Sequence, residues 1–205
     1  MAFTKETVPR IVKSVDFINV MTYDMMNRRD TVVRHHSGVA DSQTSLGLYH
    51  ERGAPMHQLN FGLGYYVKWF MVEPGCKQDD PLGCPTQLLE DPETGADMGK
   101  TGQFSWHDTV PEDLAESFVR ARAAEGNRSA DGSFGYLDVV ENRWWSYDTP
   151  AVIRDKVEVF FSKSESKRPG GVFAWGLGED APDFSRFKAT MEAVDKVEGK
   201  SKDEL

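Results

Sequence analysis

The sequence has no long apolar run and no concentration of positive charge. Among its 205 residues, no apolar stretch approaches the roughly 20 residues that a membrane-spanning helix needs, so we expect no membrane insertion. Lys and Arg number 24 against 33 Asp and Glu, which gives a net charge of −9, and they form no cluster. Because binding to a phosphate backbone needs concentrated positive charge, we also expect no nucleic-acid partner. A neutral or small ligand fits this composition better.

Cysteine and histidine offer no pattern for a metal centre. Cys76 and Cys84 are the only cysteines, and a structural zinc site needs four ligands. The five histidines show no ligand spacing, so we expect no metal and no cofactor. The two cysteines bracket a short loop rich in Asp, Pro and Gly. In an oxidising compartment they would form a disulfide that closes this loop, and the alternative is two free thiols.

Aromatic residues, in contrast, are plentiful. The chain has 12 Phe, 6 Tyr and 5 Trp within a hydrophobic share of 39%. Such a composition supports a packed core and excludes a wholly disordered chain. At about 150 residues per domain, the length predicts one domain or slightly more. We find no internal repeat and no low-complexity tract.

Hydrophobic patterning predicts strands that alternate with helices. Short apolar runs favour buried parallel strands at 15–23, 58–65 and 170–176. Apolar faces bounded by Pro or Gly predict helices at 42–53, 150–164 and 184–197. In the last helix we expect Phe187, Met191 and Val194 to face inward. This order of elements is typical of α/β folds.

A long stretch, 66–147, separates the second predicted strand from the helix at 150. Its sequence Thr109-Val-Pro-Glu112 is typical of a capping box and predicts a helix through Ala123. The segments 134–138 and 143–147 flank a turn and predict a β-hairpin. We therefore expect a small α+β subdomain inserted into one connection of the larger fold.

The two ends of the chain give different signals about location. Residues Lys202-Asp-Glu-Leu205 form the KDEL signal that retrieves proteins to the lumen of the endoplasmic reticulum. Residues 1–10 contain no apolar core of a signal peptide. We therefore expect that an N-terminal portion with such a signal is missing. The whole protein is then expected in that lumen or secreted, with the KDEL receptor as a partner. The sequon at Asn127, Asn-Arg-Ser, agrees with glycosylation on this route.

Three motifs occur in order at the predicted strands. They are Asn19-Val-Met-Thr-Tyr-Asp24, Phe61-Gly-Leu-Gly-Tyr-Tyr-Val-Lys-Trp-Phe70 and Gly170-Gly-Val-Phe-Ala-Trp-Gly-Leu-Gly-Glu-Asp180. With the inserted subdomain and Trp144-Trp-Ser-Tyr-Asp148, this set resembles the C-terminal part of a glycoside hydrolase family 18 chitinase. The resemblance covers about 8–187. It implies strands six to eight of a TIM barrel and the chitinase insertion domain of that family.

The resemblance divides the chain into four parts. Its fold class is α/β, a partial TIM (β/α)8 barrel of about three βα units with an inserted α+β subdomain. Barrel parts are expected at 1–65 and 148–198, the insertion subdomain at 66–147, and a C-terminal tail at 199–205. Since functional side chains of TIM barrels lie at the carboxyl ends of the strands, the motifs are expected to carry the site.

The resemblance also implies a site for an N-acetylated sugar. In this family the substrate's own N-acetyl oxygen attacks the anomeric carbon, without a protein nucleophile. By resemblance, Tyr23 positions and polarises that group, and Asp24 forms a hydrogen bond to the distorted sugar. Met21 lines the subsite, and Trp175 lies beneath the −1 sugar. A tyrosine hydroxyl and a carboxylate both suit an amide, and an indole face suits a sugar ring, so the residue types agree with these roles.

Tyr66 and Lys68 fall where the seventh strand of the family usually carries Tyr and Arg. Both are expected to bind substrate, although Lys68 lacks the planar fork of an arginine. The acid of the family is a Glu that closes an Asp-x-x-Asp-x-Asp-x-Glu run, and no such run occurs in these 205 residues. Asp131-Gly-Ser-Phe-Gly-Tyr-Leu-Asp138 has the wrong interior. We therefore expect this chain alone to lack leaving-group protonation and to release no sugar from chitin.

Three interpretations remain open at this point. The chain is the C-terminal portion of a chitinase that acts on β-1,4-linked N-acetylglucosamine polymers. Alternatively, it is a non-catalytic protein that binds chitin or N-acetylglucosamine oligosaccharides. A third interpretation is a half-barrel that needs a partner chain, such as the missing N-terminal half, because open strand edges expose unpaired backbone.

Overall fold

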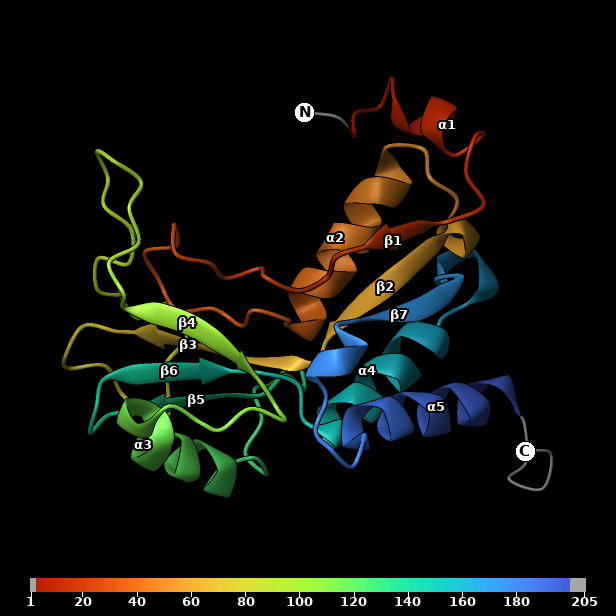
Figure 1. Ribbon diagram of the computed structural model, residues 1–205. Coiled ribbons are helices and arrows are strands. Elements are labelled where there is room, and N and C mark those ends of the chain that lie inside the picture. Colours follow the sequence, from red (N-terminus) through yellow and green to blue (C-terminus); the bar gives the residue numbers. More distant parts are fainter. Residues whose placement is uncertain (1–2, 200–205) are drawn as a thin grey trace.

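The computed structural model describes residues 3–199 and shows two separate sheets (Figure 1). One is a parallel sheet in the order β1-β2-β7, and the other is an antiparallel sheet in the order β4-β3-β6-β5. The parallel sheet consists of β1 (Ile18–Val20), β2 (Leu59–Gly64) and β7 (Gly171–Trp175). The KDEL signal at 202–205 lies outside the described residues.

Helices cover one face of the parallel sheet (Figure 1). They are α2 (Val39–Glu51), α4 (Pro150–Phe161) and α5 (Ser185–Glu198), and the short α1 (Val8–Ile11) precedes β1. Alternate residues of a strand point to opposite faces, so Leu59, Phe61 and Leu63 of β2 all enter the core beneath the helices and are at most 1% exposed. Phe61 stacks on Phe160 of α4, with ring centroids 4.5 Å apart.

The antiparallel sheet lies beside the parallel one and has its own core. Its strands are β3 (Tyr66–Met71), β4 (Thr101–Ser105), β5 (Gly135–Asp138) and β6 (Arg143–Ser146), and its helix is α3 (Glu112–Ala123). Trp145 is fully buried against α3, where its Nε1 donates to Ser117 Oγ at 2.9 Å. Trp144 is buried on the opposite face and donates to the Arg34 carbonyl at 2.9 Å. The two tryptophans therefore hold both faces of this sheet.

A buried ion pair lies where the two units join. Lys156 of α4 contacts Asp148 at 2.7 Å, and both side chains are 2% exposed. Arg186 of α5 donates from Nε to the Asp148 carbonyl at 3.1 Å. Because a buried charge is costly unless it is paired and hydrogen-bonded, this arrangement fixes α4 and α5 relative to the segment that leaves β6.

Most predicted elements are present, but three local predictions are wrong. The apolar run 15–23 forms only the short β1, and Phe17, which precedes it, is 55% exposed, because helices cover only one face of this sheet. The capping box does not form: α3 begins at Glu112 and no side chain caps it. The residue before a proline avoids helical backbone, so Val110 keeps Thr109 outside the helix.

The inward face of α5 also differs from the prediction. Phe187 and Met191 are 41% and 40% exposed, and only Val194 of the three packs partly against the core. The buried face carries Arg186, Ala189, Thr190 and Ala193 instead. Small residues on this face let α5 lie directly against α4, so the larger apolar side chains turn outward. Among the described residues, no helix is long and apolar enough to span a membrane.

Three short 3-10 helices complete the described part of the chain. They are η1 (Met56–Gln58), η2 (Glu165–Lys167) and η3 (Leu177–Glu179). Of these, η3 directly follows β7 and places its residues beside the edge where the parallel strands end.

Candidate functional site

The carboxyl ends of the three parallel strands meet at the edge that faces the antiparallel sheet (Figure 1). Tyr23 and Asp24 follow β1, Tyr66 begins β3 directly after β2, and Trp175 ends β7. Parallel strands place their carboxyl ends on one edge, which is where open α/β sheets bind ligands. The motifs that are separate in the sequence therefore lie at one location.

Asp24 is the centre of this cluster. The Tyr66 hydroxyl donates to Asp24 Oδ1 at 2.9 Å, and Lys68 Nζ donates to the same oxygen at 2.7 Å. Lys68 Nζ also donates to the Met26 carbonyl at 3.4 Å. The Asp24 side chain is 50% exposed, whereas that of Lys68 is 11% exposed. One carboxylate oxygen is thus held by two donors of the protein, and the side chain remains half-exposed.

The environment of Tyr66 keeps its hydroxyl protonated. Burial, and then the negative charge of Asp24, raise the pKa of Tyr66 well above its usual value. Asp24 itself has backbone φ of +57°, a left-handed conformation. Such a conformation is uncommon for a residue other than glycine.

Tyr23 is the buried neighbour of this pair. Its hydroxyl is shielded from solvent and has no hydrogen-bond partner among the described residues. The ring packs edge-on against Tyr66 and Phe173, with centroids 6.2 Å away in each case. A Cβ at Gly62 would lie 2.7 Å from the Tyr23 ring, so this glycine makes room for it. Burial and the Asp24 charge raise the pKa of Tyr23, and its hydroxyl is therefore a donor without an acceptor.

Trp175 and Met21 lie on the open face of the parallel sheet. Trp175 is 57% exposed, and its carbonyl accepts from the Tyr65 N–H at 2.7 Å. The peptide bond between Trp175 and Gly176 is cis. Met21 is 67% exposed, and in the described part of the chain it makes no hydrogen bond to the Asp24 cluster. Tyr23, Asp24, Tyr66 and Lys68 are thus brought into contact, while Trp175 and Met21 flank them.

Two residues near this cluster were missed from the sequence. Glu179 follows Trp175 on η3, and burial together with the charges of Asp108 and Asp24 raises its pKa. Its place just after a strand was the signal that could have identified it. His36 packs against Tyr66 with ring centroids 5.3 Å apart. Both its ring nitrogens are buried without a partner in the described chain, and no sequence pattern marks it.

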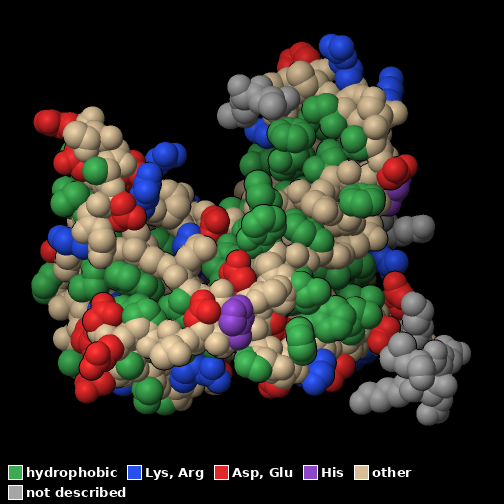
Figure 2. Space-filling view, in the orientation of Figure 1, with side chains coloured by type: hydrophobic (Ala, Val, Ile, Leu, Met, Phe, Trp, Pro, Cys, Tyr) green, Lys and Arg blue, Asp and Glu red, His purple; other side chains and the backbone are tan. Residues whose placement is uncertain are grey.

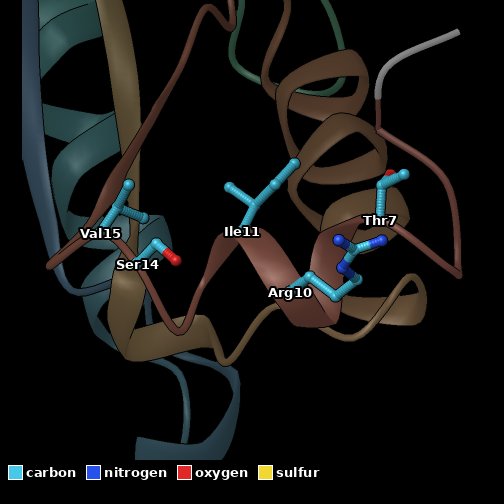
Figure 3. Close-up of a pocket in the computed structure, with 5 residues that line it drawn as sticks. All are labelled: Thr7, Arg10, Ile11, Ser14 and Val15. Atoms are coloured by element: carbon cyan, nitrogen blue, oxygen red, sulfur yellow. The ribbon is translucent and has the colours of Figure 1, made fainter.

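The surface beside Lys68 is hollowed. Figure 2 shows a notch between the lobe with the parallel sheet and the lobe with the antiparallel sheet, with apolar side chains on the first wall and charged ones at the base. A hollow of about 430 Å³ adjoins Lys68 and is lined by Asn27, Arg28 and Gln103 among others. Another, of about 450 Å³, lies between α1 and the turn before β1 and contains none of the predicted site residues (Figure 3).

Other predicted positions lie away from this cluster in the fold. Cys76 and Cys84 form a disulfide in the loop after β3. Asn127 is exposed in the turn after α3. Within residues 3–199, no three His, Cys, Asp or Glu side chains are placed to hold a metal ion.

Comparison with known proteins identifies the family. The family model of Glycosyl hydrolases family 18 matches residues 2–180. The chain belongs to this family. Chitinase C from Streptomyces lividans is 25% identical over 180 residues, which cover 82% of this chain and 25% of that protein. The chitinase-like mite allergen Der f 18.0101 from Dermatophagoides farinae is 31% identical over 78 residues, 38% of this chain and 17% of the allergen.

Solved structures show the same fold at low sequence identity. The chitinase from Rhizomucor miehei superposes with a TM-score of 0.68 at 19% identity, over 91% of this chain and 55% of that one. The Ostrinia furnacalis Group IV chitinase, solved with allosamidin, gives a TM-score of 0.64 at 18% identity, over 98% of this chain and 57% of that one. The family 18 member described here therefore spans about half the length of these structures and less of the curated relatives.

Proposed function

We propose that this chain is the C-terminal part of a chitinase-like hydrolase and that its Asp24 cluster binds N-acetylglucosamine units. The observation that carries the proposal is the shared acceptor: Tyr66 and Lys68 both donate to Asp24 Oδ1, beside the unpartnered Tyr23 hydroxyl. The Cycas revoluta family 18 chitinase, which has the same fold, was solved with (GlcNAc)3. A chitin oligosaccharide is the ligand that this similarity supports.

Each residue has a role that its surroundings allow. The buried Tyr23 hydroxyl donates to the N-acetyl oxygen of the sugar as that oxygen attacks the anomeric carbon, in the substrate-assisted reaction of the family. Asp24 accepts a hydrogen bond from the distorted sugar at one carboxylate oxygen, while Lys68 Nζ donates to the other, Oδ1. The exposed indole of Trp175 stacks beneath the sugar ring, and Met21 lines the same face.

The architecture we propose is part of a TIM barrel. Parallel sheets normally have both faces covered, but here the face with Met21 and Trp175 is exposed. In our proposal that face lines the inside of a barrel. Residues 1–65 and 148–198 form the barrel part, and residues 66–147 form the inserted subdomain. The barrel needs further strands to close, and the family acid is not in these residues. This chain alone then binds sugar weakly and does not cleave it.

The first test is turnover by the chain alone. General acid catalysis contributes about 10²–10⁴-fold, so we expect no release of sugar from chitin oligomers above the uncatalysed rate. Reproducible turnover that survives replacement of Asp24 and of every other acid in turn would contradict the assignment.

The second test uses the chain reconstituted with the preceding strands of a family relative. Trp175→Ala removes stacking area worth roughly 1–3 kcal/mol, so it should raise KM and lower kcat/KM together. Tyr23→Phe removes a contact that strengthens towards the transition state, so it should lower kcat more than it raises KM. Equal effects on KM alone from both variants would mean that Tyr23 only lines the cleft and makes no contact specific to the transition state.

The open edges of β1 and β7 favour a second candidate, a half-barrel that functions only with a partner chain. These strands terminate the parallel sheet on both sides, and unpaired strand edges invite pairing with another chain. Size-exclusion chromatography with and without the complementary half distinguishes the two candidates. A stable monomer that is retained on a chitin column would instead identify a non-catalytic binding protein.

Location is a separate proposal. Lys202-Asp-Glu-Leu205 returns the protein to the endoplasmic reticulum lumen through the KDEL receptor, and the disulfide between Cys76 and Cys84 agrees with an oxidising compartment. Fluorescence imaging of the protein behind a secretion leader tests it. Deletion of Leu205 should convert retention into secretion, and equal retention of both forms would contradict it.

A further inference from the structure

A third hollow, a groove of about 680 Å³, lies on the antiparallel unit between the disulfide loop and the turn after α3. Its volume is within the range of small-molecule sites. Gln78 and Asp79 of the disulfide loop line it, and so do Asn127 and Tyr136. No residue of the Asp24 cluster lines this groove. It therefore needs an explanation of its own.

Asn127 lies at the edge of this groove in a fixed turn. Its N–H donates to the Ala124 carbonyl at 2.8 Å, and the Ser129 N–H donates to the Ser133 carbonyl at 2.9 Å. Ser129 Oγ lies 2.7 Å from His35 Nε2. Asn127 itself is exposed, so its amide is open to solvent while the rest of the sequon is anchored. The first unit of any group attached to this amide therefore lies next to the groove.

The lining suits a sugar. Tyr136 on β5 is half-buried and offers an aromatic face, and aromatic rings bury large apolar area at little cost in side-chain freedom. The amide of Gln78 and the carboxylate of Asp79 line the same groove and supply a donor and acceptors for hydroxyl groups. The disulfide between Cys76 and Cys84 holds these two residues in a short closed loop.

We propose that Asn127 carries an N-linked oligosaccharide whose first sugar lies in this groove against Tyr136. The donor is an oligosaccharide joined to a lipid pyrophosphate. The C1–O bond of that donor breaks, a bond forms between C1 and Asn127 Nδ2, the amide loses one proton, and the lipid pyrophosphate leaves with the bonding electrons. The proposal rests on the sequon and the groove and is independent of the Asp24 cluster.

The first experiment asks whether the modification exists. The full chain is expressed behind a cleavable leader in animal cells, and the Asn127 peptide is analysed by mass spectrometry. Treatment with an amidase that removes N-linked glycans should convert Asn127 to Asp. Asn127→Gln and Ser129→Ala should carry no glycan, whereas Ser129→Thr, which keeps the hydroxyl of the sequon, should carry it. An unmodified Asn127 in the wild-type chain overturns the proposal.

The second experiment asks where the first sugar lies. Trimming the glycan to that single sugar should leave the Tm unchanged, and complete removal should lower it by roughly 2–4 °C, a measurable shift for a chain of this size. Tyr136→Leu keeps apolar packing but removes the aromatic face, and it should abolish this difference. Gln78→Ala, at another residue that lines the groove, should reduce it.

Two results would overturn the groove assignment. One is an equal Tm for the single-sugar and the sugar-free chains, and the other is an undiminished difference in both Tyr136→Leu and Gln78→Ala. Trp175→Ala, which tests the sugar cleft, should leave the glycan and the Tm difference intact. A failure of the cleft proposal is therefore distinguishable from a failure of this one.

Discussion

The two sheets of this molecule differ in how deeply their tryptophans are buried. In the antiparallel unit, Trp144 and Trp145 are both 0% exposed, because helix α3 covers one face and the loops after β1 and β3 cover the other. In the parallel unit, helices cover one face and Trp175 on the other is 57% exposed. The first unit encloses its core, and the second offers an apolar face together with the Asp24 cluster.

This difference in burial assigns stability to one unit and ligand binding to the other. Enclosed aromatic side chains contribute to the free energy of unfolding, while the half-exposed Trp175 contributes little to it and is free to contact a ligand. The charged groups follow the same division: the Lys156–Asp148 pair is 2% exposed, whereas Asp24 of the Lys68–Asp24 pair is 50% exposed. The following substitutions test this comparison, beginning with the largest expected effect.

Trp145→Ala should have the largest effect. The indole is fully buried and donates to Ser117 Oγ, so its loss should lower the free energy of unfolding by about 3–5 kcal/mol. Urea denaturation measures the change. Val140→Ala, at a hairpin residue that is 72% exposed, is the control and should change stability by less than about 0.5 kcal/mol. Equal losses in both variants would contradict an enclosed core.

His36→Leu should change the pH dependence of stability. Burial, and then the charges of Lys68 and Lys156, hold the pKa of His36 well below its ordinary 6.5. A histidine whose pKa is lowered in the folded protein binds its additional proton mainly in the unfolded state. Its stabilisation is therefore complete above pH 6.5 and is lost on acidification below it, by about 1.4 kcal/mol per pH unit at most.

Urea denaturation of wild type and His36→Leu on either side of that pH measures the effect. The wild type should lose stability more steeply on the acid side than the variant does. His35, whose pKa burial also lowers, remains in both proteins and serves as an internal reference. The same slope in both proteins would show that His36 is not the group responsible.

Tyr66→Phe should have a moderate effect on stability and a larger one on the site. It removes the 2.9 Å hydrogen bond to Asp24, and a typical hydrogen bond contributes about 1 kcal/mol. Thermal unfolding measures stability, and binding of a chitin oligosaccharide to the reconstituted protein measures the site. Tyr49→Phe, which loses a hydroxyl on α2 with no bond in the described chain, should change neither. A variant that binds as wild type does would remove Tyr66 from the site.

Trp175→Ala should have the smallest effect on stability. Its side chain is exposed, so the free energy of unfolding should change by about 0.5 kcal/mol or less, which urea denaturation resolves against Trp145→Ala. A loss as large as that of Trp145→Ala would mean that the open face is part of the core, and the contrast between the two sheets would fail.

Much of the architecture was predictable because it depends on local patterns. The order of strands and helices follows from short apolar runs and from Pro and Gly at helix ends, and the β5–β6 hairpin follows from its alternating segments. The positions of Tyr23, Asp24 and Trp175 at strand ends also follow from the motifs. The family followed from the order of those motifs, and residues 2–180 match it.

Other features required the tertiary structure, since they depend on which elements meet. An apolar stripe on a helix does not say which neighbour it faces, and α5 packs its alanines on α4 while Phe187 and Met191 stay outside. The bond from Lys68 to Asp24 joins residues far apart in the chain, and His36 is buried only because the two sheets meet there. Sequence patterns determined which elements form and which residues end the strands. Long-range packing alone decided which faces are enclosed, because burial is a property of the assembled surfaces.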